Sequence, residues 1–223
     1  RYEQTLNTDQ DNGIIFSVPE GKSADEMRST LLPLAERINA ALDACGFPLC
    51  KGNIMASNPK WCLSLEEWKG AFSEWIEHGD PDALLNSTIF FDFRPLWGNA
   101  ALADALRAWL MPHAAANPRF LHQMAVNALR NRPPLGMVRD FVVDGGTLDL
   151  KLNGVSPFVD AARIFSLAAG SGETSTIRRL RARWRASSRT SAPRVSWRRI
   201  GASACGASSW LRRLAPVSHS RSS

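Results

Sequence analysis

Residues 8–18 read TDQDNGIIFSV, and they decide how the start of the chain is interpreted. Ile14, Ile15 and Phe16 form a short apolar run rich in β-forming residues, which predicts a buried strand. Two carboxylates, Asp9 and Asp11, come just before this run. Because side chains two residues apart in an extended chain project to the same face, we expect these two carboxylates to share one face.

A pair of carboxylates on one face can hold a hard cation such as Mg²⁺, or bridge two of them. Such ions activate an attacking oxygen and stabilise a leaving pyrophosphate, which is what nucleotidyl transfer requires. An isolated Asp-x-Asp pattern is nevertheless weak, since most such pairs are solvated turn residues. The assignment of Asp9 and Asp11 therefore depends on the residues around them.

The next region predicts a helix followed by a second strand. Ser23 and Glu26 fit a capping box, and Gly46 supplies a helix stop. Pro33 lies inside this helix and is expected to kink or divide it. Residues 47–56, FPLCKGNIMA, are the predicted second strand. The apolar face of the helix comprises Met27, Leu31, Leu34, Ile38, Leu42 and Cys45.

Helices dominate the remainder of the prediction. Ser64 and Glu67 form another candidate capping box. Trp61, Trp68 and Trp75 are spaced for one helix face, and core packing is favoured over a base-stacking platform. After a break at residues 78–81, TIFFDF at 88–93 predicts a strand or extended segment. Further helices are predicted over residues 99–111, from 117 to before 133, and over 156–170, with a small hairpin over 138–152.

Bulk composition, with 44% hydrophobic and 22% charged residues, is typical of soluble globular proteins. The sequence has no apolar run of the roughly 18 residues that a membrane helix needs, so no membrane partner is expected. It shows no secretory leader, and its four cysteines match no zinc-binding spacing. We therefore expect a cytoplasmic protein with reduced thiols.

The positive charge is concentrated at one end of the chain. Residues 171–223 contain 12 Arg, no Lys and a single acid, Glu173. Residues 183–223 also lack Phe, Tyr, Met, Asn and Gln. We interpret 183–223 as a low-complexity Arg/Ser/Ala tail, expected to be disordered, and hypothesise that it is a GC-rich coding region read out of frame. An Arg-rich nucleic-acid arm is the weaker alternative, so no specific nucleic-acid partner is expected.

The residues around the two aspartates resemble the signature of one family. These are the bacterial nucleotidyltransferases related to the N-terminal region of protein-PII uridylyltransferase, in which G-S-x-G-R leads into E-Q-x-L-x-T-D-Q-D-N. Residues 3–12 here read EQTLNTDQDN, and the resemblance spans about residues 1–170. The further matching motifs are GFPLCKGNIMA (46–56), NPKW (58–61), LEEW (65–68), IFFDFR (89–94) with Gly98, PPLG (133–136), LDLK (148–151) and AAR (161–163).

The resemblance implies an α+β protein of two parts. Residues 1–82 would form an incomplete polymerase-β-like nucleotidyltransferase domain, a small mixed sheet with helices. Residues 83–182 would form a mostly helical substrate-binding domain. In the family, cyclic-nucleotide-binding and CBS domains often lie upstream, so such domains are expected in the full-length protein.

The same resemblance implies the site residues. Asp9 and Asp11 would be catalytic metal ligands for Mg²⁺, and Arg1, Thr8, Asn12 and Arg94 would bind or position the nucleotide. Thr8 and Asn12 could equally be polar residues at the edge of a strand. Arg94 could meet phosphate with two hydrogen bonds, or form an ion pair with Asp92 or another neighbour.

Two departures from the family pattern affect these expectations. The chain starts at the Arg of G-S-x-G-R, so we expect the Gly-Ser segment, which grips triphosphate through backbone N–H groups at a helix N-terminus, to be missing. Enzymes of this fold usually carry a third carboxylate on the next strand, but residues 49–56 contain no acid. Asp92 is the nearest candidate, either completing the metal site or serving the structure.

Taken together, the sequence predicts Mg²⁺-dependent transfer of UMP or AMP from a nucleoside triphosphate to a protein or small-molecule acceptor in signal transduction. The alternative is a nucleotide-sensing regulatory module without turnover, which the lack of a third acid at residues 49–56 favours.

Overall fold

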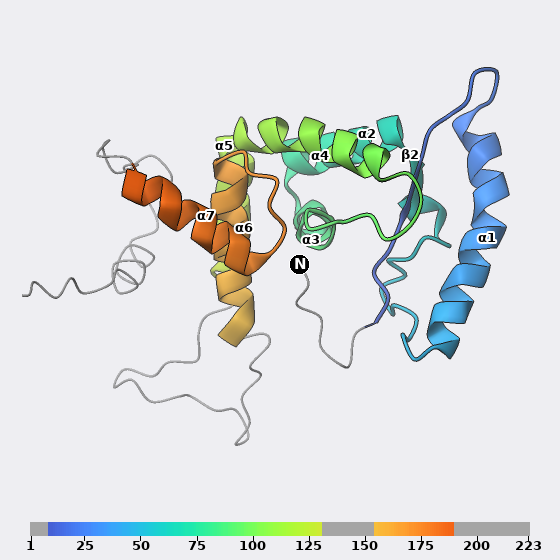
Figure 1. Cartoon of the computed structure of the whole chain (residues 1–223), viewed down its shortest axis with the longest axis horizontal. Coiled ribbons are helices and arrows are strands. Elements are labelled where there is room, and N and C mark those ends of the chain that lie inside the picture. Colours follow the sequence, from blue (N-terminus) through green and yellow to red (C-terminus); the bar gives the residue numbers. More distant parts are fainter. Residues whose placement is uncertain (1–8, 131–153, 190–223) are drawn as a thin grey trace, which may run out of the picture. The chain divides into compact units, whose positions relative to one another are not determined.

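The computed structural model describes residues 9–130 and 154–189 of the chain (Figure 1). Internal packing separates residues 1–183 from 184–223, and the fold described here is that of the first unit. The elements, in order, are β1 (Ile14–Phe16), α1 (Ala24–Ala44), a 3-10 turn (Pro59–Trp61), β2 (Cys62–Ser64), α2 (Leu65–His78), α3 (Pro81–Phe90), α4 (Ala100–Ala115), α5 (Pro118–Ala128), α6 (Ser156–Ala168) and α7 (Thr176–Arg189). The described part is thus α+β, mostly helical with a small sheet, as predicted.

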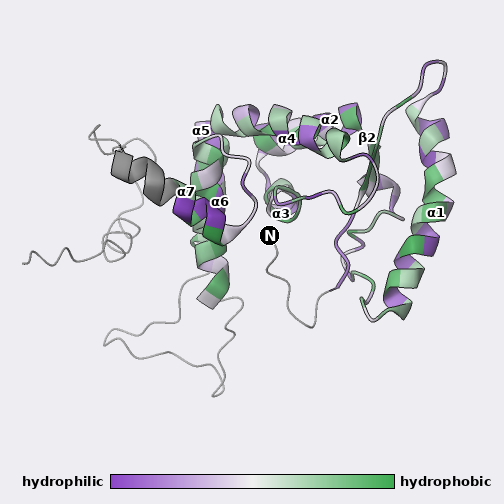
Figure 2. Ribbon diagram, viewed as in Figure 1, coloured by the Kyte–Doolittle hydropathy of each residue, from purple (hydrophilic) through white to green (hydrophobic). Residues whose placement is uncertain are grey.

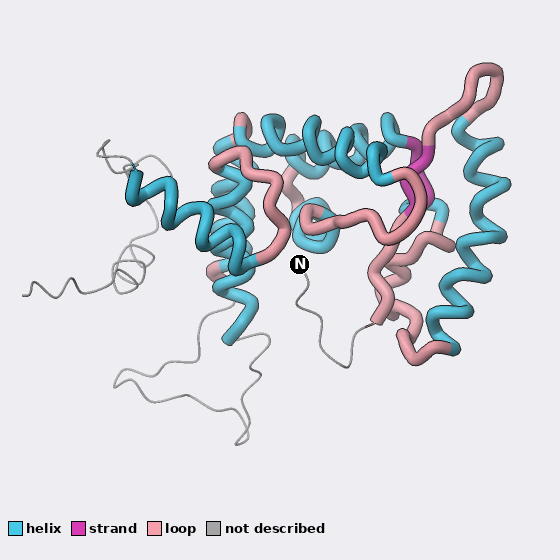
Figure 3. Tube along the Cα trace, viewed as in Figure 1, coloured by secondary structure: helices cyan, strands magenta, loops and turns pink. Residues whose placement is uncertain are grey.

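The sheet consists of two parallel strands, drawn in magenta in Figure 3. β1 pairs with β2 so that Ile15 lies opposite Leu63. Parallel neighbours need a long crossover, and α1 provides it. The predicted strand at Ile14–Phe16 is therefore confirmed, whereas its partner is a segment for which no strand was predicted.

The strand predicted at residues 47–56 is wrong. This segment forms turns, in which the Asn53 amide donates to the Cys50 carbonyl at 2.9 Å and Asn53 itself has a φ of 55°. Pro48 and Gly52 are both poor strand residues, which explains the interruption. The segment still lies along the start of the chain, because the amides of Gln10 and Asn12 donate to carbonyls at its two ends.

Helix α1 begins as predicted, with the Ser23–Glu26 capping box in place. Of the two expected effects of Pro33, the division does not occur, because α1 continues through it as one helix. The expected kink stays a prediction. The buried face of α1 is offset from the apolar stripe: Ala35 and Asn39 are buried, whereas Leu34 and Ile38 are 45% and 44% exposed. The helix is thus oriented by a small residue and a polar one rather than by its largest apolar side chains.

A tryptophan cluster forms the centre of the core, so the predicted role of Trp61, Trp68 and Trp75 in core packing is confirmed. The predicted single helix face is wrong for Trp61, which lies in the 3-10 turn before β2, whereas Trp68 and Trp75 lie on α2. Trp61 and Trp68 stack with ring centroids 6.2 Å apart, and Phe90 lies 4.6 Å from Trp61. The indole N–H of Trp68 donates to the Ile14 carbonyl at 2.9 Å, so α2 is bonded to β1. Burying an indole with its N–H satisfied gives both apolar area and orientation.

The strand predicted at residues 88–93 is also wrong. Asp80 caps α3 and Pro81 occupies its first turn, so the helix that begins at the predicted break runs to Phe90. Phe90 and Phe91 are buried against the aromatic core. Tertiary packing of these rings has overridden the β preference of TIFFDF.

The remaining predicted helices are present. Asn99 caps α4, and Asn117 with Pro118 begins α5. α6 begins at Ser156, without a side-chain cap. α7 crosses the boundary placed at residue 183, and its first turns are mostly hydrophilic (Figure 2). The hairpin predicted at 138–152 lies outside the described residues. Within residues 9–130 and 154–189, no helix combines the length and apolar character that a membrane crossing needs.

Candidate active site

The two aspartates flank a buried residue in an extended segment that leads into β1. Asp9 and Asp11 are exposed, whereas Gln10 between them is 5% exposed. This alternation places both carboxylates on the side opposite Gln10. Two carboxylates on one exposed face supply the oxygen donors that a hard dication prefers, so the residues present fit Mg²⁺.

Gln10 anchors this segment to α1 and to the loop that follows it. Its Nε2 donates to the carbonyls of Asn39 at 2.9 Å and Phe47 at 2.8 Å. Its Oε1 accepts from Nδ2 of Asn39 at 2.7 Å. A buried amide with its donors and acceptor bonded has one favoured orientation. Gln10 therefore holds the backbone segment that carries the two aspartates.

Asn12 belongs to the same polar network. Its Oδ1 accepts from Nδ2 of Asn39 at 3.0 Å and from the Ala56 amide at 2.8 Å. The backbone N–H of Asn12 donates to the Ile54 carbonyl at 3.1 Å. These contacts are those of the structural alternative, and they hold the 47–57 loop beside the aspartates. The role of Asn12 toward a nucleotide stays a prediction.

Sequence reasoning missed Gln10 and Asn39 as the residues that support the pair. The available signal was Asn39, a polar residue in the interior of a predicted helix. Asn is disfavoured there unless its side chain finds hydrogen-bond partners, so its presence indicates such partners. Arg1 and Thr8 lie outside the described residues, so their assignment remains a prediction.

The loop where a third acid was sought does approach the pair. Burial raises the pKa of the Cys50 thiol, backbone N–H groups oppose this shift, and a contact with the Asp11 carboxylate adds to it. Cys50 thus stands beside Asp11, in the segment in which the resemblance led us to expect an acid. A neutral thiol there supplies no hard oxygen ligand.

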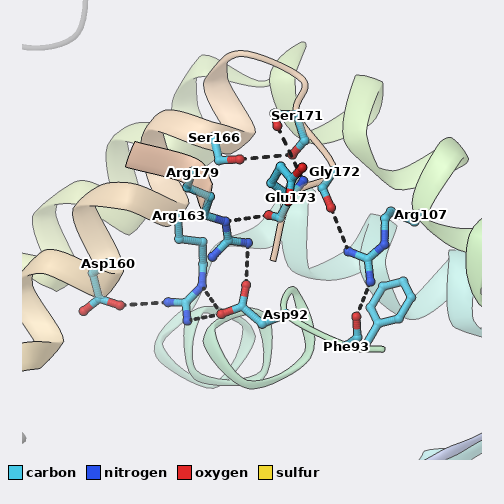
Figure 4. A network of polar contacts seen from close by, with 10 residues as sticks. All are labelled: Asp92, Phe93, Arg107, Asp160, Arg163, Ser166, Ser171, Gly172, Glu173 and Arg179. Atoms are coloured by element: carbon cyan, nitrogen blue, oxygen red, sulfur yellow. Dashed lines mark hydrogen bonds and ion pairs between the residues drawn. The ribbon is translucent and has the colours of Figure 1, made fainter. Parts of the chain in front are cut away.

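Asp92, the other candidate for the third carboxylate, is held in a buried ion-pair network (Figure 4). Its Oδ2 accepts from Nη2 of Arg163 at 2.7 Å and from Nε at 3.2 Å, and its Oδ1 accepts from Nη2 of Arg179 at 2.5 Å. Arg163 also donates to Asp160 at 2.8 Å. The side chains of Asp92 and the two arginines are 8%, 2% and 2% exposed.

The network changes the ionisation of Asp92. Burial alone would raise the pKa of this carboxyl, but the guanidinium groups of Arg163 and Arg179 outweigh burial and hold the pKa below its ordinary value. Asp92 is therefore an anion that neutralises buried cations from α6 and α7.

Across the described ranges, no group of three or more His, Cys, Asp or Glu side chains is placed to hold a metal ion. Asp92 is accordingly not gathered with Asp9 and Asp11 into a three-carboxylate cluster. Its observed contacts are those of the structural alternative, and its role as a third carboxylate stays a prediction.

Arg94 lies at the surface two residues after Asp92, in the segment that joins α3 to α4. The ion pairs of Asp92 described above go instead to α6 and α7, from residues far along the chain. The role of Arg94 toward phosphate stays a prediction.

Two segments of the chain are similar to family models. Residues 1–82 match the family described as "Putative nucleotidyltransferase DUF294", and residues 118–191 match "Putative nucleotidyltransferase substrate binding domain". No curated protein and no solved structure matches the chain. Asp9 and Asp11 lie in the first segment, and Arg163 and Arg179 in the second. At the family level, these matches support nucleotidyl transfer.

Proposed function

We propose that this chain, which is similar to both domains of a nucleotidyltransferase family, transfers a nucleotidyl group from a nucleoside triphosphate with Asp9 and Asp11 as its Mg²⁺ ligands. The observation that carries the proposal is the pair itself: two exposed carboxylates on one face, flanking the buried Gln10, within the matched segment. The donor would be UTP or ATP, as in protein-PII uridylyltransferase, which the sequence resembles.

The reaction breaks a phosphoanhydride bond of the nucleoside triphosphate and forms a phosphoester bond to the acceptor. The hydroxyl oxygen of the acceptor bonds to the α-phosphorus, and the bond from that phosphorus to the bridging oxygen of the β-phosphate breaks. Pyrophosphate leaves, and the hydroxyl proton is lost to a base. Bound Mg²⁺ would neutralise phosphate charge and stabilise the leaving pyrophosphate.

The chain's own residues would orient this chemistry. Gln10 and Asn39 fix the segment that carries the aspartates, so both carboxylates are directed to solvent before a ligand arrives. Ordering ligands in advance lowers the cost of binding the ion. The acceptor, a protein or small molecule in a signalling pathway, would engage the second matched segment, and CBS or cyclic-nucleotide-binding domains would regulate the full-length protein.

One observation favours a second function. The Asp11 neighbourhood contains Cys50 rather than an acid, and Asp92 is committed to ion pairs. A site with two carboxylates can hold a metal–nucleotide complex while lacking the charge to drive transfer. The second candidate is therefore a nucleotide-sensing regulatory module.

Label transfer separates the two. The full chain is incubated with Mg²⁺, a cell extract and UTP or ATP labelled at the α-phosphate. Transfer that requires Mg²⁺ and is lost in Asp9→Ala and Asp11→Ala supports the enzyme. Glu36→Ala removes an exposed carboxylate on α1 and should leave transfer unchanged. Nucleotide binding without any labelled product would overturn the enzyme and support the sensor.

A further inference from the structure

Arg107 on α4 is a partly buried cation whose contacts within the described residues are all with neutral groups. Its Nη2 donates to the Phe93 carbonyl, and its Nη1 lies 3.5 Å from the Gly172 carbonyl. The guanidinium carbon stands 4.2 Å from the centroid of the Phe93 ring (Figure 4). A guanidinium has five N–H donors, so these two carbonyls use only part of its capacity.

The neighbouring arginines differ from Arg107 in having carboxylate partners. Arg163 pairs with Asp92 and Asp160, and Arg179 pairs with the other oxygen of Asp92. Arg107 forms no ion pair with any carboxylate of residues 9–130 or 154–189, including Asp104 one turn before it on α4. Of the three arginines Arg107, Arg163 and Arg179, only Arg107 has no carboxylate partner among these residues.

The electrostatic environment agrees with this geometry. Burial lowers the pKa of Arg107, the negative charges of Asp92 and Asp104 oppose that shift, and the positive charge of Arg179 adds to it. The net direction is downward, so the surroundings leave the charge of Arg107 incompletely compensated. An anionic group that contacts Arg107 would supply the missing compensation.

A hollow of about 370 Å³ opens beside this side chain. Its walls come from α4, including Asp104, Arg107 and Met111, and from the turn that contains Gly170 and Gly172. A Cβ at position 172 would lie 3.2 Å from Cδ of Arg107, so an alanine there would shift the arginine stem by a few tenths of an ångström. The hollow is shallow and largely open to solvent, and its wall contains one cation that has no carboxylate partner among the described residues.

We propose that Arg107 and this hollow bind the oxyanion of a small molecule, a carboxylate or a phosphate group. Planar guanidinium donors match such oxygens in pairs, which favours this chemistry over a halide ion. Asp104 in the same wall repels negative charge, so a singly charged carboxylate should bind more tightly than a phosphate dianion. The inference rests on α4 and the 170–172 turn, and does not depend on nucleotidyl transfer.

The test is calorimetric titration of the full chain with sodium acetate and with sodium phosphate, each against sodium chloride at the same ionic strength. We expect the chain to bind an oxyanion more tightly than chloride. Arg107→Met should weaken oxyanion binding at least about tenfold. Asp104→Asn should strengthen it, which a merely structural role for Arg107 would not produce. Arg119→Met removes an exposed arginine on α5 and serves as the matched control.

Two further variants keep the proposal testable if Arg107→Met does not fold. Arg107→Lys retains the charge but loses the paired donors, and Gly172→Ala displaces the side chain while leaving its charge. Both should weaken oxyanion binding. Equal binding of oxyanion and chloride by the wild-type chain, or unchanged oxyanion binding in the folded Arg107 variants, would overturn the proposal.

Discussion

Replacing Asp92 by Asn removes the one carboxylate that Arg163 and Arg179 share. After the change, Arg163 keeps its bond to Asp160 at 2.8 Å, but Arg179 keeps only the Glu173 carbonyl at 2.6 Å. Both guanidinium side chains are 2% exposed, so their charge cannot be relieved by water. Breaking a buried pair in this way costs about 3–5 kcal/mol of unfolding free energy.

Urea denaturation at neutral pH measures this cost. With a slope of about 2 kcal/mol per molar urea, the midpoint should fall by roughly 2 M. Asp160→Asn is the matched control, because it removes the more exposed partner of Arg163 while Asp92 remains, and should cost about 1 kcal/mol. A loss below about 1 kcal/mol for Asp92→Asn, or an equal loss for both variants, would refute the account of the network.

The effect of Asp92→Asn on the free energy of unfolding should depend on pH. Because the folded-state pKa of Asp92 is below its ordinary value, its contribution to stability is fully present above the unfolded pKa. That contribution is lost as pH falls through the folded pKa. The difference in unfolding free energy between wild type and Asp92→Asn should therefore narrow below about pH 4. A difference that stays constant into that range would contradict the assigned ionisation.

Three further variants test other parts of the fold by the same urea midpoint. Trp68→Phe deletes the indole bond to the Ile14 carbonyl and should cost about 1–3 kcal/mol. Ser64→Ala removes the N-cap of α2 and should cost about 1 kcal/mol. Asn39→Ala removes the side-chain bonds to Oε1 of Gln10, to Oδ1 of Asn12 and from the Ser57 amide, and should cost about 1–3 kcal/mol, with faster amide exchange in the 47–57 loop. Midpoints equal to wild type would contradict each assignment in turn.

Local signals predicted the helices well. The capping boxes at Ser23 and Ser64, and the Asn117–Pro118 start of α5, appear where the sequence placed them. Each depends on a side chain bonding a backbone N–H a few residues away, so the information lies within one turn of chain. The shared face of Trp68 and Trp75 was predictable for the same reason, since both lie on α2, whereas Trp61 reaches the same cluster from the 3-10 turn before β2.

Both wrong strands were decided by contacts distant in sequence. TIFFDF became the end of α3 and the turn after it, where Phe90 and Phe91 pack on rings contributed by α2. Residues 47–56 became a loop pinned by Gln10 and Asn12. Nothing in the local composition of either segment reports those partners, and β propensity is a weak guide when packing decides.

The site was predictable only in part. The two aspartates could be found from the sequence, because alternation along an extended segment determines their shared face. The partners of Asp92 lie 71 and 87 residues away along the chain. No spacing rule connects them, so an arginine pair that buries the carboxylate could not be anticipated from the IFFDFR motif.

Metal binding at Asp9 and Asp11 tests the central claim most directly. Mn²⁺ favours the same oxygen ligands as Mg²⁺. Free Mn²⁺ gives an electron paramagnetic resonance signal, so the loss of that signal measures how much of the ion is bound. Titrating the full chain with Mn²⁺, with and without UTP, should show a site that is at least about tenfold weaker in Asp9→Asn and in Asp11→Asn. Glu36→Gln should bind as wild type does. Equal Mn²⁺ affinity in wild type and both aspartate variants, under both conditions, would contradict the account.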